Sequence, residues 1–258
     1  MADRKLVLSP TRIRTYLECP RLYRYVYLEK LPRYFKARAS FSFGTSLHRA
    51  LQEYHAAGGP QTQDAAALAG RLEQHWIGAG YNSTASEQQR AALGREILAA
   101  YHDAGAGQEG VTRFTEKTLR ADMGDYFLTG RVDRIDELAD GSLEVIDYKS
   151  GAHLPSPAEV ADDLAIAIYQ LLCVRLLARV AVKGSIIHLL SGQKVSVTRS
   201  PAALEPVAAA VDDLHARIRS EQEFARVADE RCEGCDFFHR CFGRRPRGAP
   251  PAVEDVAP

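Results

Sequence analysis

The segment GRVDRIDELADGSLEVIDYKSG, residues 130–151, constrains the fold more than any other part of this chain. Apolar and polar residues alternate on both sides of Asp140-Gly141, and this dipeptide is a strong hairpin turn signal. The pattern predicts two antiparallel strands joined by a tight turn. With the segment that precedes them, three strands are expected, over residues 112–119, 126–135 and 143–148.

Two carboxylates and one ammonium group are expected to meet at the edge of this sheet. Strand side chains alternate between faces, so Asp147 and Lys149 share one face, and the hairpin brings Asp133 beside Asp147. Carboxylate oxygens suit Mg²⁺ or Mn²⁺, and a neighbouring lysine can stabilise negative charge on a phosphate. An exposed ion pair would also give a D-x-K pattern, but here the charges follow the apolar run LEVID. The pattern favours a site for phosphodiester hydrolysis.

The rest of the chain alternates helical and strand patterns. Helices are expected over residues 9–30, 44–55, 164–180 and 201–220, with two more within 64–102, and a second strand hairpin is expected over 185–190 and 194–198. This order predicts one mixed α/β domain over residues 1–245, with a helical insertion at about 61–104. The Pro- and Ala-rich residues 246–258 are expected to be disordered.

Charge is balanced over the whole chain but not along it. The 33 basic and 33 acidic side chains cancel, which argues mildly against a nucleic-acid partner. Residues 1–49 nevertheless carry eleven basic and three acidic side chains, and Arg240, Arg244, Arg245 and Arg247 follow later. If both segments meet in space, they form a positive surface that suits DNA; a solvated basic face is the alternative. The first residues lack an apolar signal region, so a cytoplasmic protein is expected.

The five cysteines indicate a metal or cluster site. An odd number in a cytoplasmic chain argues against a disulfide framework. Cys232, Cys235 and Cys241 form a C-x2-C-x5-C set, and Cys19, which precedes a proline, is the natural fourth donor. Zinc and an iron–sulfur cluster both accept four thiolates, and the spacing does not choose between them. Cys173 lies in an apolar segment and is expected to be a small buried side chain.

Several motifs together resemble the RecB-like branch of the PD-(D/E)XK nuclease superfamily. They appear in the order of that family and span roughly residues 8–242: SPTRIRTYLECPRLYRYVYLEKL, FGTSLHRALQ, GRVDRID, EVIDYKSG, YQLLCVRLL and CEGCDFFHRC. The resemblance implies a restriction-endonuclease-like mixed sheet flanked by helices and the activity of a metal-dependent deoxyribonuclease. It covers residues 61–110 poorly.

The resemblance assigns roles to individual residues. Asp133 and Asp147 become ligands of Mg²⁺ or Mn²⁺, with His48 and the backbone carbonyl of Tyr148 as further ligands. Lys149 becomes the catalytic lysine. A lone histidine on a helix is otherwise more often structural or exposed, so the assignment of His48 depends on the family motif.

Gln170 is expected near the active site on the helix after the strands. The family often has a tyrosine four residues later, where this chain has Val174, and this departure weakens the role of Gln170. Tyr169 does not replace that tyrosine, because its position does not share a helical face with residue 174. Glu116, on the preceding strand, is a further candidate beside the ligands.

For the cysteines, the resemblance favours a [4Fe–4S] cluster over zinc. AddB-type helicase–nuclease subunits and CRISPR-associated adaptation nucleases pair one N-terminal cysteine with a C-terminal C-x2-C-x5-C set. Cys19 with Cys232, Cys235 and Cys241 repeats that arrangement. A structural cluster that clasps the two ends of the chain is expected, because closing so long a loop stabilises a fold.

The function expected from these motifs is a DNA nuclease in repair, recombination or CRISPR adaptation. Its substrate would be single-stranded DNA or DNA ends, and its partner a helicase or a CRISPR integrase. Exo- or endonucleolytic action and DNA or RNA preference stay open. One alternative is a DNA-binding or assembly module that keeps the nuclease fold without cutting, although an intact Asp133, Asp147 and Lys149 set argues against it. Another is a zinc-clasped protein-interaction domain, which metal content and colour distinguish.

Overall fold

The computed structural model describes residues 5–33, 37–177 and 182–243, so the expected disordered tail lies outside the described residues. The chain forms two compact units, each built from two separate stretches. We call Met1–Pro10 with Ala37–His215 the sheet unit, and Thr11–Lys36 with Ala216–Pro258 the clasp unit. Two compact units are not by themselves two folding domains, and the single domain over residues 1–245 stays a prediction.

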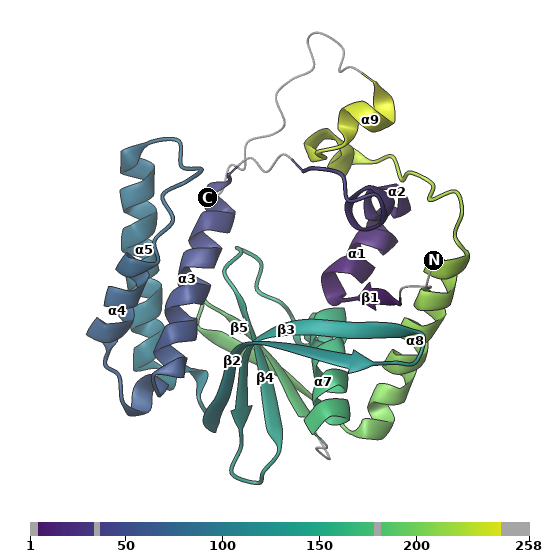
Figure 1. Cartoon of the computed structure of the whole chain (residues 1–258). Helices are drawn as coiled ribbons and strands as arrows, with labels where there is room; N and C mark the ends of the chain where they lie inside the picture. Colours follow the sequence, from purple (N-terminus) through teal and green to yellow (C-terminus); the bar gives the residue numbers. More distant parts are fainter. Residues whose placement is uncertain (1–4, 34–36, 178–181, 244–258) are drawn as a thin grey trace. The chain divides into compact units, whose positions relative to one another are not determined.

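One mixed sheet forms the centre of the sheet unit (Figure 1). Its strands are β1 Leu6–Leu8, β2 Val111–Asp122, β3 Tyr126–Glu137, β4 Leu143–Lys149, β5 Val182–His188 and β6 Gln193–Arg199. The three strands predicted around the Asp140-Gly141 turn and the second hairpin are confirmed, with bounds that differ by up to three residues; the strand expected over 185–190 is shifted to Val182–His188. The short β1, which pairs in parallel with β3, was not predicted because three residues carry too little pattern to recognise.

The sheet divides within β3, at the position of the predicted ligand Asp133. β2 pairs along almost the whole of β3, so β1 and β4 share the other edge of that strand. The ladder between β3 and β4 reaches only as far as Arg134 opposite Ile146, whereas β4 continues beside β5 to Lys149. Past the last pair, the backbone N–H of Tyr148 donates to Asp133 Oδ2 at 2.9 Å. A side chain thus takes the place of the backbone ladder in a fork between β3 and β4.

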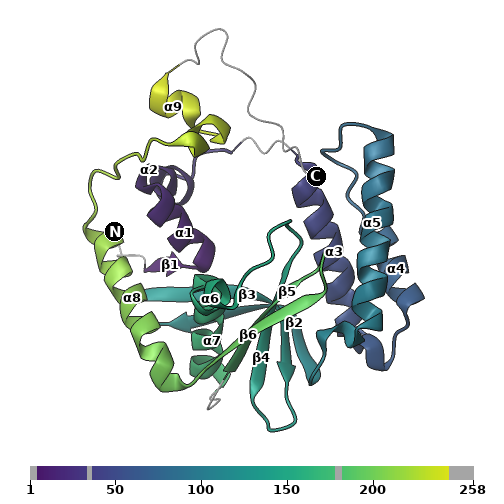
Figure 2. The same cartoon turned by 180° about the vertical axis from the view of Figure 1, so that it is seen from behind.

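Helices cover both faces of this sheet (Figures 1 and 2). They are α3 Ala39–Ala56, α4 Ala65–Gln74, α5 Thr84–Asp103, α6 Pro157–Ala161, α7 Leu164–Leu177 and α8 Pro201–Ser220, the last of which runs into the clasp unit. Leu47 of α3 and Leu98 of α5 share a buried apolar cluster with Ile146 of β4. On the opposite face, Ile166 of α7 packs with Ile186 of β5. The α4–α5 pair matches the helical insertion that the sequence predicts.

The clasp unit contains the N-terminal helices and the C-terminal cysteine segment. Its elements are α1 Pro10–Glu18, α2 Pro20–Tyr23, the π-helical η1 Arg24–Leu28, the 3-10 turn η4 Glu230–Gly234 and α9 Phe238–Phe242. The single helix expected over residues 9–30 is therefore wrong. It breaks at Cys19, which is extended with φ −160° and ψ 104° because a residue before proline disfavours the helical region.

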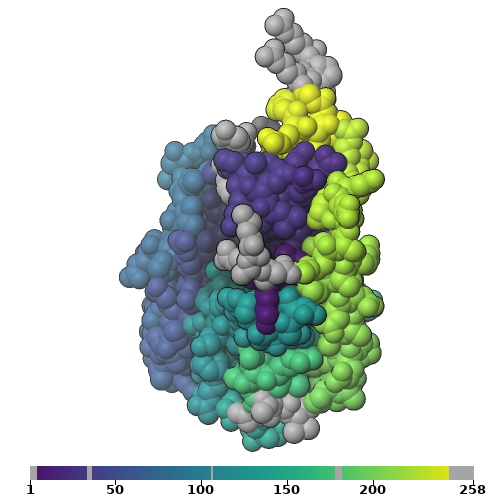
Figure 3. Space-filling view, turned by 45° about the vertical axis from the view of Figure 1, so that its right-hand side comes forward, coloured from purple at the N-terminus to yellow at the C-terminus, as the bar shows by residue number. Residues whose placement is uncertain are grey.

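The tyrosines of the N-terminal helices form the core of the clasp unit. Tyr16 and Tyr23 are 3% and 1% exposed, and their rings pack edge to face at 5.6 Å between centroids. Tyr16 also packs against Phe224, and the backbone N–H of Arg21 donates to the Ala225 carbonyl. Figure 3 shows the yellow C-terminal segment lying against the purple N-terminal helices. These tyrosines are packed inside the unit and are not available as stacking platforms for bases.

None of the helices among the described residues combines the length and apolarity needed to cross a membrane.

Candidate active site

Three elements bring potential metal ligands together at the fork. His48 comes from α3, Glu116 from β2 and Asp133 from β3, and their ligand atoms all lie within 4.8 Å of one another. Within this group, His48 Nδ1 is 3.3 Å from Asp133 Oδ2. From β4, Asp147 adds a second aspartate whose charge acts on Asp133 and His48, and Asp147 Oδ2 is 2.6 Å from Lys149 Nζ. The structure therefore brings His48 and Asp133 together with Glu116 and places the Asp147–Lys149 pair within the electrostatic reach of Asp133, while the roles of these residues stay a prediction.

Glu116 reaches this group through an unusual backbone conformation. Its φ is +48°, in the left-handed region that costs a residue with a Cβ roughly 1–2 kcal/mol. The pairs Thr115–Arg134 and Lys117–Val132 flank it in the ladder, which places Glu116 opposite Asp133. The sequence marks Glu116 only as a candidate beside the ligands. The structure places its carboxylate in the same group as His48 and Asp133.

The electrostatics of the site are those of crowded negative charge. Burial and the neighbouring charge of Asp133 raise the pKa of Asp147 to about 6, against the opposing effect of Lys149. Burial and Asp133 also raise the pKa of Glu116. Burial lowers the pKa of His48, but the hydrogen bond and charge of Asp133 outweigh it and the pKa is raised. Because each carboxylate disfavours ionisation of its neighbour, a bound divalent cation would stabilise their ionised forms.

Lys149 keeps its positive charge beside the carboxylates. Burial lowers its pKa, but the charge of Asp147 and the hydrogen bond to it outweigh burial, so the pKa is raised. The side chain is 42% exposed, so its ammonium group is open to solvent while paired with Asp147. A permanent cation with free donor positions suits the stabilisation of a phosphate oxygen.

Gln170 is buried away from the carboxylates. Its amide nitrogen donates to the backbone carbonyls of Val182 at 2.7 Å and Val197 at 3.1 Å, and its amide oxygen accepts from Arg199. These contacts tie α7 to β5 and β6. Among the described residues, the structure gives Gln170 no contact with the ligand group, and a role for it in the chemistry stays a prediction.

Tyr169 lies beside the site although no sequence motif predicts this position. Burial, followed by the charges of Asp147 and Asp133, raises the pKa of its phenol, so the side chain lies within the field of the site. The ring packs on Gly130, where a Cβ would come within 2.7 Å of Tyr169 Cε1. This close approach explains why the motif GRVDRID begins with glycine. The sequence alone does not show which ring requires it.

The four predicted cysteine ligands line one small cavity in the clasp unit. Cys19, Cys232, Cys235 and Cys241 surround it together with Tyr25 and Phe237, and its volume is about 30 Å³. All four are free thiols, and burial raises the pKa of Cys235. Cys173 is fully buried in α7, as predicted. Four soft donors around one apolar cavity are the donor set that zinc or an iron–sulfur cluster binds.

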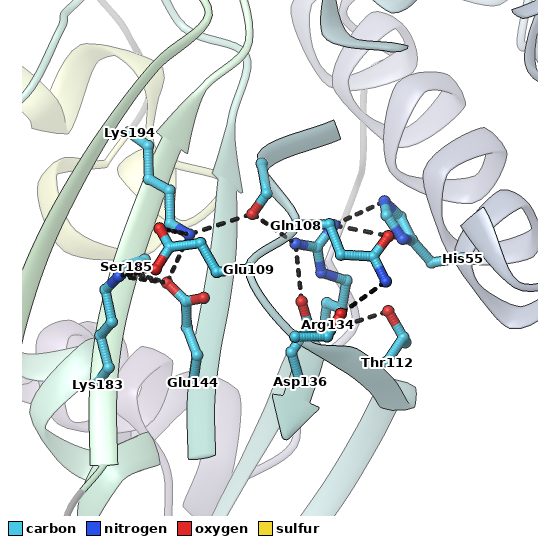
Figure 4. Close-up of polar contacts among 12 residues, drawn as sticks. His55, Gln108, Glu109, Thr112, Arg134, Asp136, Glu144, Lys183, Ser185 and Lys194 are labelled. Carbon is cyan, nitrogen blue, oxygen red and sulfur yellow. Dashed lines mark hydrogen bonds and ion pairs between the residues drawn. The ribbon is translucent and has the colours of Figure 1, made fainter. Parts of the chain in front are cut away.

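A buried polar network surrounds Arg134, the residue that follows Asp133 on β3 (Figure 4). Arg134 itself is fully buried. The guanidinium forms an ion pair with Asp136 at 3.0 Å and donates to Gly107 O at 3.1 Å and His55 Nε2 at 2.6 Å. A second part of the network joins Glu144 to Lys194 at 2.8 Å. Buried charge is tolerated only when paired, so this network fixes β3, β4 and α3 to one another.

His55 makes the network sensitive to pH. Burial and the charge of Arg134 lower the pKa of His55 to about 2, against about 6.5 in an unfolded chain. A histidine whose pKa is lowered on folding stabilises the fold at pH values above its pKa in the unfolded chain. This contribution is lost as pH falls below about 6.5. We expect the free energy of unfolding to fall by up to about 1.4 kcal/mol per pH unit between pH 6.5 and 5. In His55→Gln, which keeps an acceptor for Arg134 but cannot titrate, this slope is expected to be smaller by that amount.

Urea unfolding of both proteins at pH 5, 6 and 7 measures the difference between the two slopes. Because every other titrating group is common to both proteins, equal slopes would contradict the neutral state of buried His55.

Comparisons with known proteins agree with this architecture. The family model of the PD-(D/E)XK nuclease superfamily matches residues 7–242. Two curated relatives, each described as one of the subunits of an ATP-dependent helicase/deoxyribonuclease, come from Streptococcus pyogenes serotype M49 (strain NZ131) and serotype M6 (strain ATCC BAA-946 / MGAS10394). They are 54% and 56% identical over 39 residues, which is 15% of this chain and only 4% of their own length.

A solved structure shares the fold. It is the crystal structure of a protein from Eubacterium rectale described as a "Putative exonuclease", with a TM-score of 0.56, 12% sequence identity and coverage of 95% of this chain and 90% of that one. The family model spans nearly the whole chain, including every element that carries the ligand group. This chain belongs to the PD-(D/E)XK nuclease superfamily.

Proposed function

We propose that the chain is a Mg²⁺- or Mn²⁺-dependent deoxyribonuclease that hydrolyses phosphodiester bonds at the fork between β3 and β4. The convergence of His48, Asp133 and Asp147 from three elements, with Lys149 beside them, carries the proposal. Oxygen-rich ligands with one imidazole suit Mn²⁺ and Mg²⁺. Glu116 lies within the same group and is a further candidate ligand.

Each residue of the group has a distinct role in this proposal. His48, Asp133, Asp147 and the backbone carbonyl of Tyr148 would hold the ion, which supplies Lewis acidity toward the phosphate when bound. Lys149 stays protonated, because Asp147 raises its pKa, and would donate to the phosphate oxygen on which negative charge develops. The N–H of Tyr148 donates to Asp133 Oδ2 and so holds the Asp133 carboxylate in place from the backbone.

The cysteine cavity supports a [4Fe–4S] cluster as a structural group. Cys19, Cys232, Cys235 and Cys241 line one cavity, and four thiolates suit either zinc or a cluster. The preference for a cluster rests on the resemblance of the Cys19 and C-x2-C-x5-C arrangement to AddB-type subunits.

The substrate we propose is DNA that is single-stranded or has free ends. Two curated relatives carry "helicase/deoxyribonuclease" in their names. The clasp unit carries a basic N-terminal segment, in which Arg14 of α1 is exposed. A helicase or a CRISPR integrase is the partner we expect, in DNA repair, recombination or CRISPR adaptation.

Incubation of anaerobically purified protein with end-labelled single- and double-stranded DNA tests the proposal. We expect cleavage with Mn²⁺ or Mg²⁺, and its complete loss when EDTA removes the ion and Ca²⁺ replaces it. Iron and sulfide analysis of the same sample is expected to give a filled cluster and a brown colour. Folded protein that binds DNA without cutting it in either ion would overturn the proposal in favour of a binding module.

A further inference from the structure

The three elements that carry the candidate ligands also meet at a second point, inside the lobe of α3 and α5. Arg134 follows Asp133 on β3, Tyr148 lies between Asp147 and Lys149 on β4, and His55 lies two helical turns after His48 on α3. The side chains of Arg134, Tyr148 and His55 come together around one hydroxyl group. That hydroxyl belongs to Tyr101 of α5.

Tyr101 is the centre of this second meeting point. Its hydroxyl lies 2.7 Å from Arg134 Nη1, 2.8 Å from His55 Nε2 and 3.0 Å from the hydroxyl of Tyr148. Arg134 Nη1 also donates to the Tyr148 hydroxyl at 3.0 Å. Tyr101 is 4% exposed, so water does not replace these partners.

Aromatic packing connects this point directly to a candidate ligand. The ring of Tyr148 packs edge to face on the ring of Tyr101, with centroids 6.0 Å apart. The same ring also packs edge to face with the imidazole of His48, with centroids 5.8 Å apart. A shift of the Tyr148 ring would therefore move both the imidazole of His48 and the backbone between Asp147 and Lys149.

The fork explains why such support is needed. Past Arg134 and Ile146, no ladder pair joins β3 to β4 in the described residues, and the remaining backbone link is the Tyr148 N–H to Asp133. Residues that hold ligands in place must themselves be fixed by packing and hydrogen bonds, and loss of such partners typically weakens metal binding by about 10–100-fold.

We propose that Tyr101 and Arg134 are positioning residues of the metal site, which hold α3, β3 and β4 at the separation that the ion requires. This inference rests on the proposed function. Neither residue touches the substrate or the ion. They act through His55 and Tyr148.

Tyr101→Phe tests the proposal, because it removes the central hydroxyl and leaves every ligand-bearing element unchanged. Tyr126→Phe is the matched control: Tyr126 is 2% exposed, lies on β3 and donates its hydroxyl to Asp212 at 2.6 Å. We expect Mn²⁺ to bind about tenfold more weakly to Tyr101→Phe and with unchanged affinity to the control, measured by electron paramagnetic resonance of free Mn²⁺. Melting temperatures of the two variants check that both are folded.

A double-mutant cycle with Tyr148→Phe adds a second measurement. The two hydroxyls form one hydrogen bond, so we expect the double variant to lose less Mn²⁺ affinity than the product of the two single losses. Unchanged Mn²⁺ affinity in Tyr101→Phe, with Asp133→Asn abolishing binding, would overturn the positioning role alone. Wild-type protein whose Mn²⁺ binding is indifferent to Asp133→Asn would instead overturn the proposed metal site itself.

Discussion

Replacing Lys149 by alanine is expected to lower the rate of DNA cleavage at saturating Mn²⁺ by at least about a hundredfold, with no loss of folded protein. Removal of one preorganised donor from a charge-stabilising site typically costs about 10²–10³ in rate. A second effect concerns metal binding. Lys149 lowers the pKa of Asp147, which is about 6 with the lysine present, so its removal raises that pKa further and weakens Mn²⁺ binding at neutral pH, which saturating Mn²⁺ offsets.

The matched control for this variant is Lys5→Ala. Lys5 also pairs with a single aspartate, Asp122, at 2.8 Å. It lies in the same unit, next to the first residues of β3. Single-turnover cleavage by both variants, with melting temperatures for each, separates chemistry from folding. Full activity in Lys149→Ala would place the chemistry elsewhere, and equal losses in both variants would point to a general effect of positive charge on DNA binding.

Replacing Cys19 by alanine is expected to remove most of the bound iron and to lower the melting temperature by roughly 10–20 °C. Cys19 and Cys232 are 213 positions apart (232 − 19), and closing a loop of that size stabilises a fold by up to about 5 kcal/mol. For a chain of this length, 1 kcal/mol corresponds to about 2–4 °C in melting temperature. Iron analysis and calorimetry of anaerobic samples measure both effects.

Cys173→Ala is the control for the cysteine prediction. Cys173 is fully buried in α7 and belongs to the sheet unit, so its removal costs packing but no ligand. We expect this variant to keep its full iron content with only a small fall in melting temperature. A Cys19→Ala protein that keeps all its iron would show that the fourth ligand is another residue. A protein that loses iron without losing stability would show that the cluster is not structural.

The sequence predicts the strands, most helices and the pairing of Asp133 with Asp147 because each depends on local patterns, whereas the assignment of His48 depends on the family resemblance. The Asp140-Gly141 turn and the alternation around it determine the hairpin, and the hairpin brings Asp133 and Asp147 together. Pro20 carries the signal for the break at Cys19, because a proline disfavours the helical conformation of the residue before it. The helical pattern of the surrounding residues obscures this signal.

The features that were missed depend on contacts between distant residues. The left-handed conformation of Glu116, the ring of Tyr169 on Gly130 and the burial of Arg134 have no signature in the residues beside them. Arg134 illustrates the difficulty well. An arginine between two aspartates on a strand reads as a surface pattern, whereas its partners Tyr101 and His55, far away in the chain, place it in the core.

Because the chain is synthesised from its N-terminal side, the two halves of the clasp unit become available at different times. The clasp unit joins residues 11–36 to residues 216–258, so its first half leaves the ribosome long before its second. At about 5–20 residues per second, the N-terminal helices wait roughly 10–40 s with the apolar faces of Tyr16 and Tyr23 uncovered. The proposed cluster would therefore be loaded last. If it stabilises the clasp unit as proposed, cells that make the chain faster than they supply the cluster are expected to accumulate protein with a formed sheet and an open, aggregation-prone clasp unit.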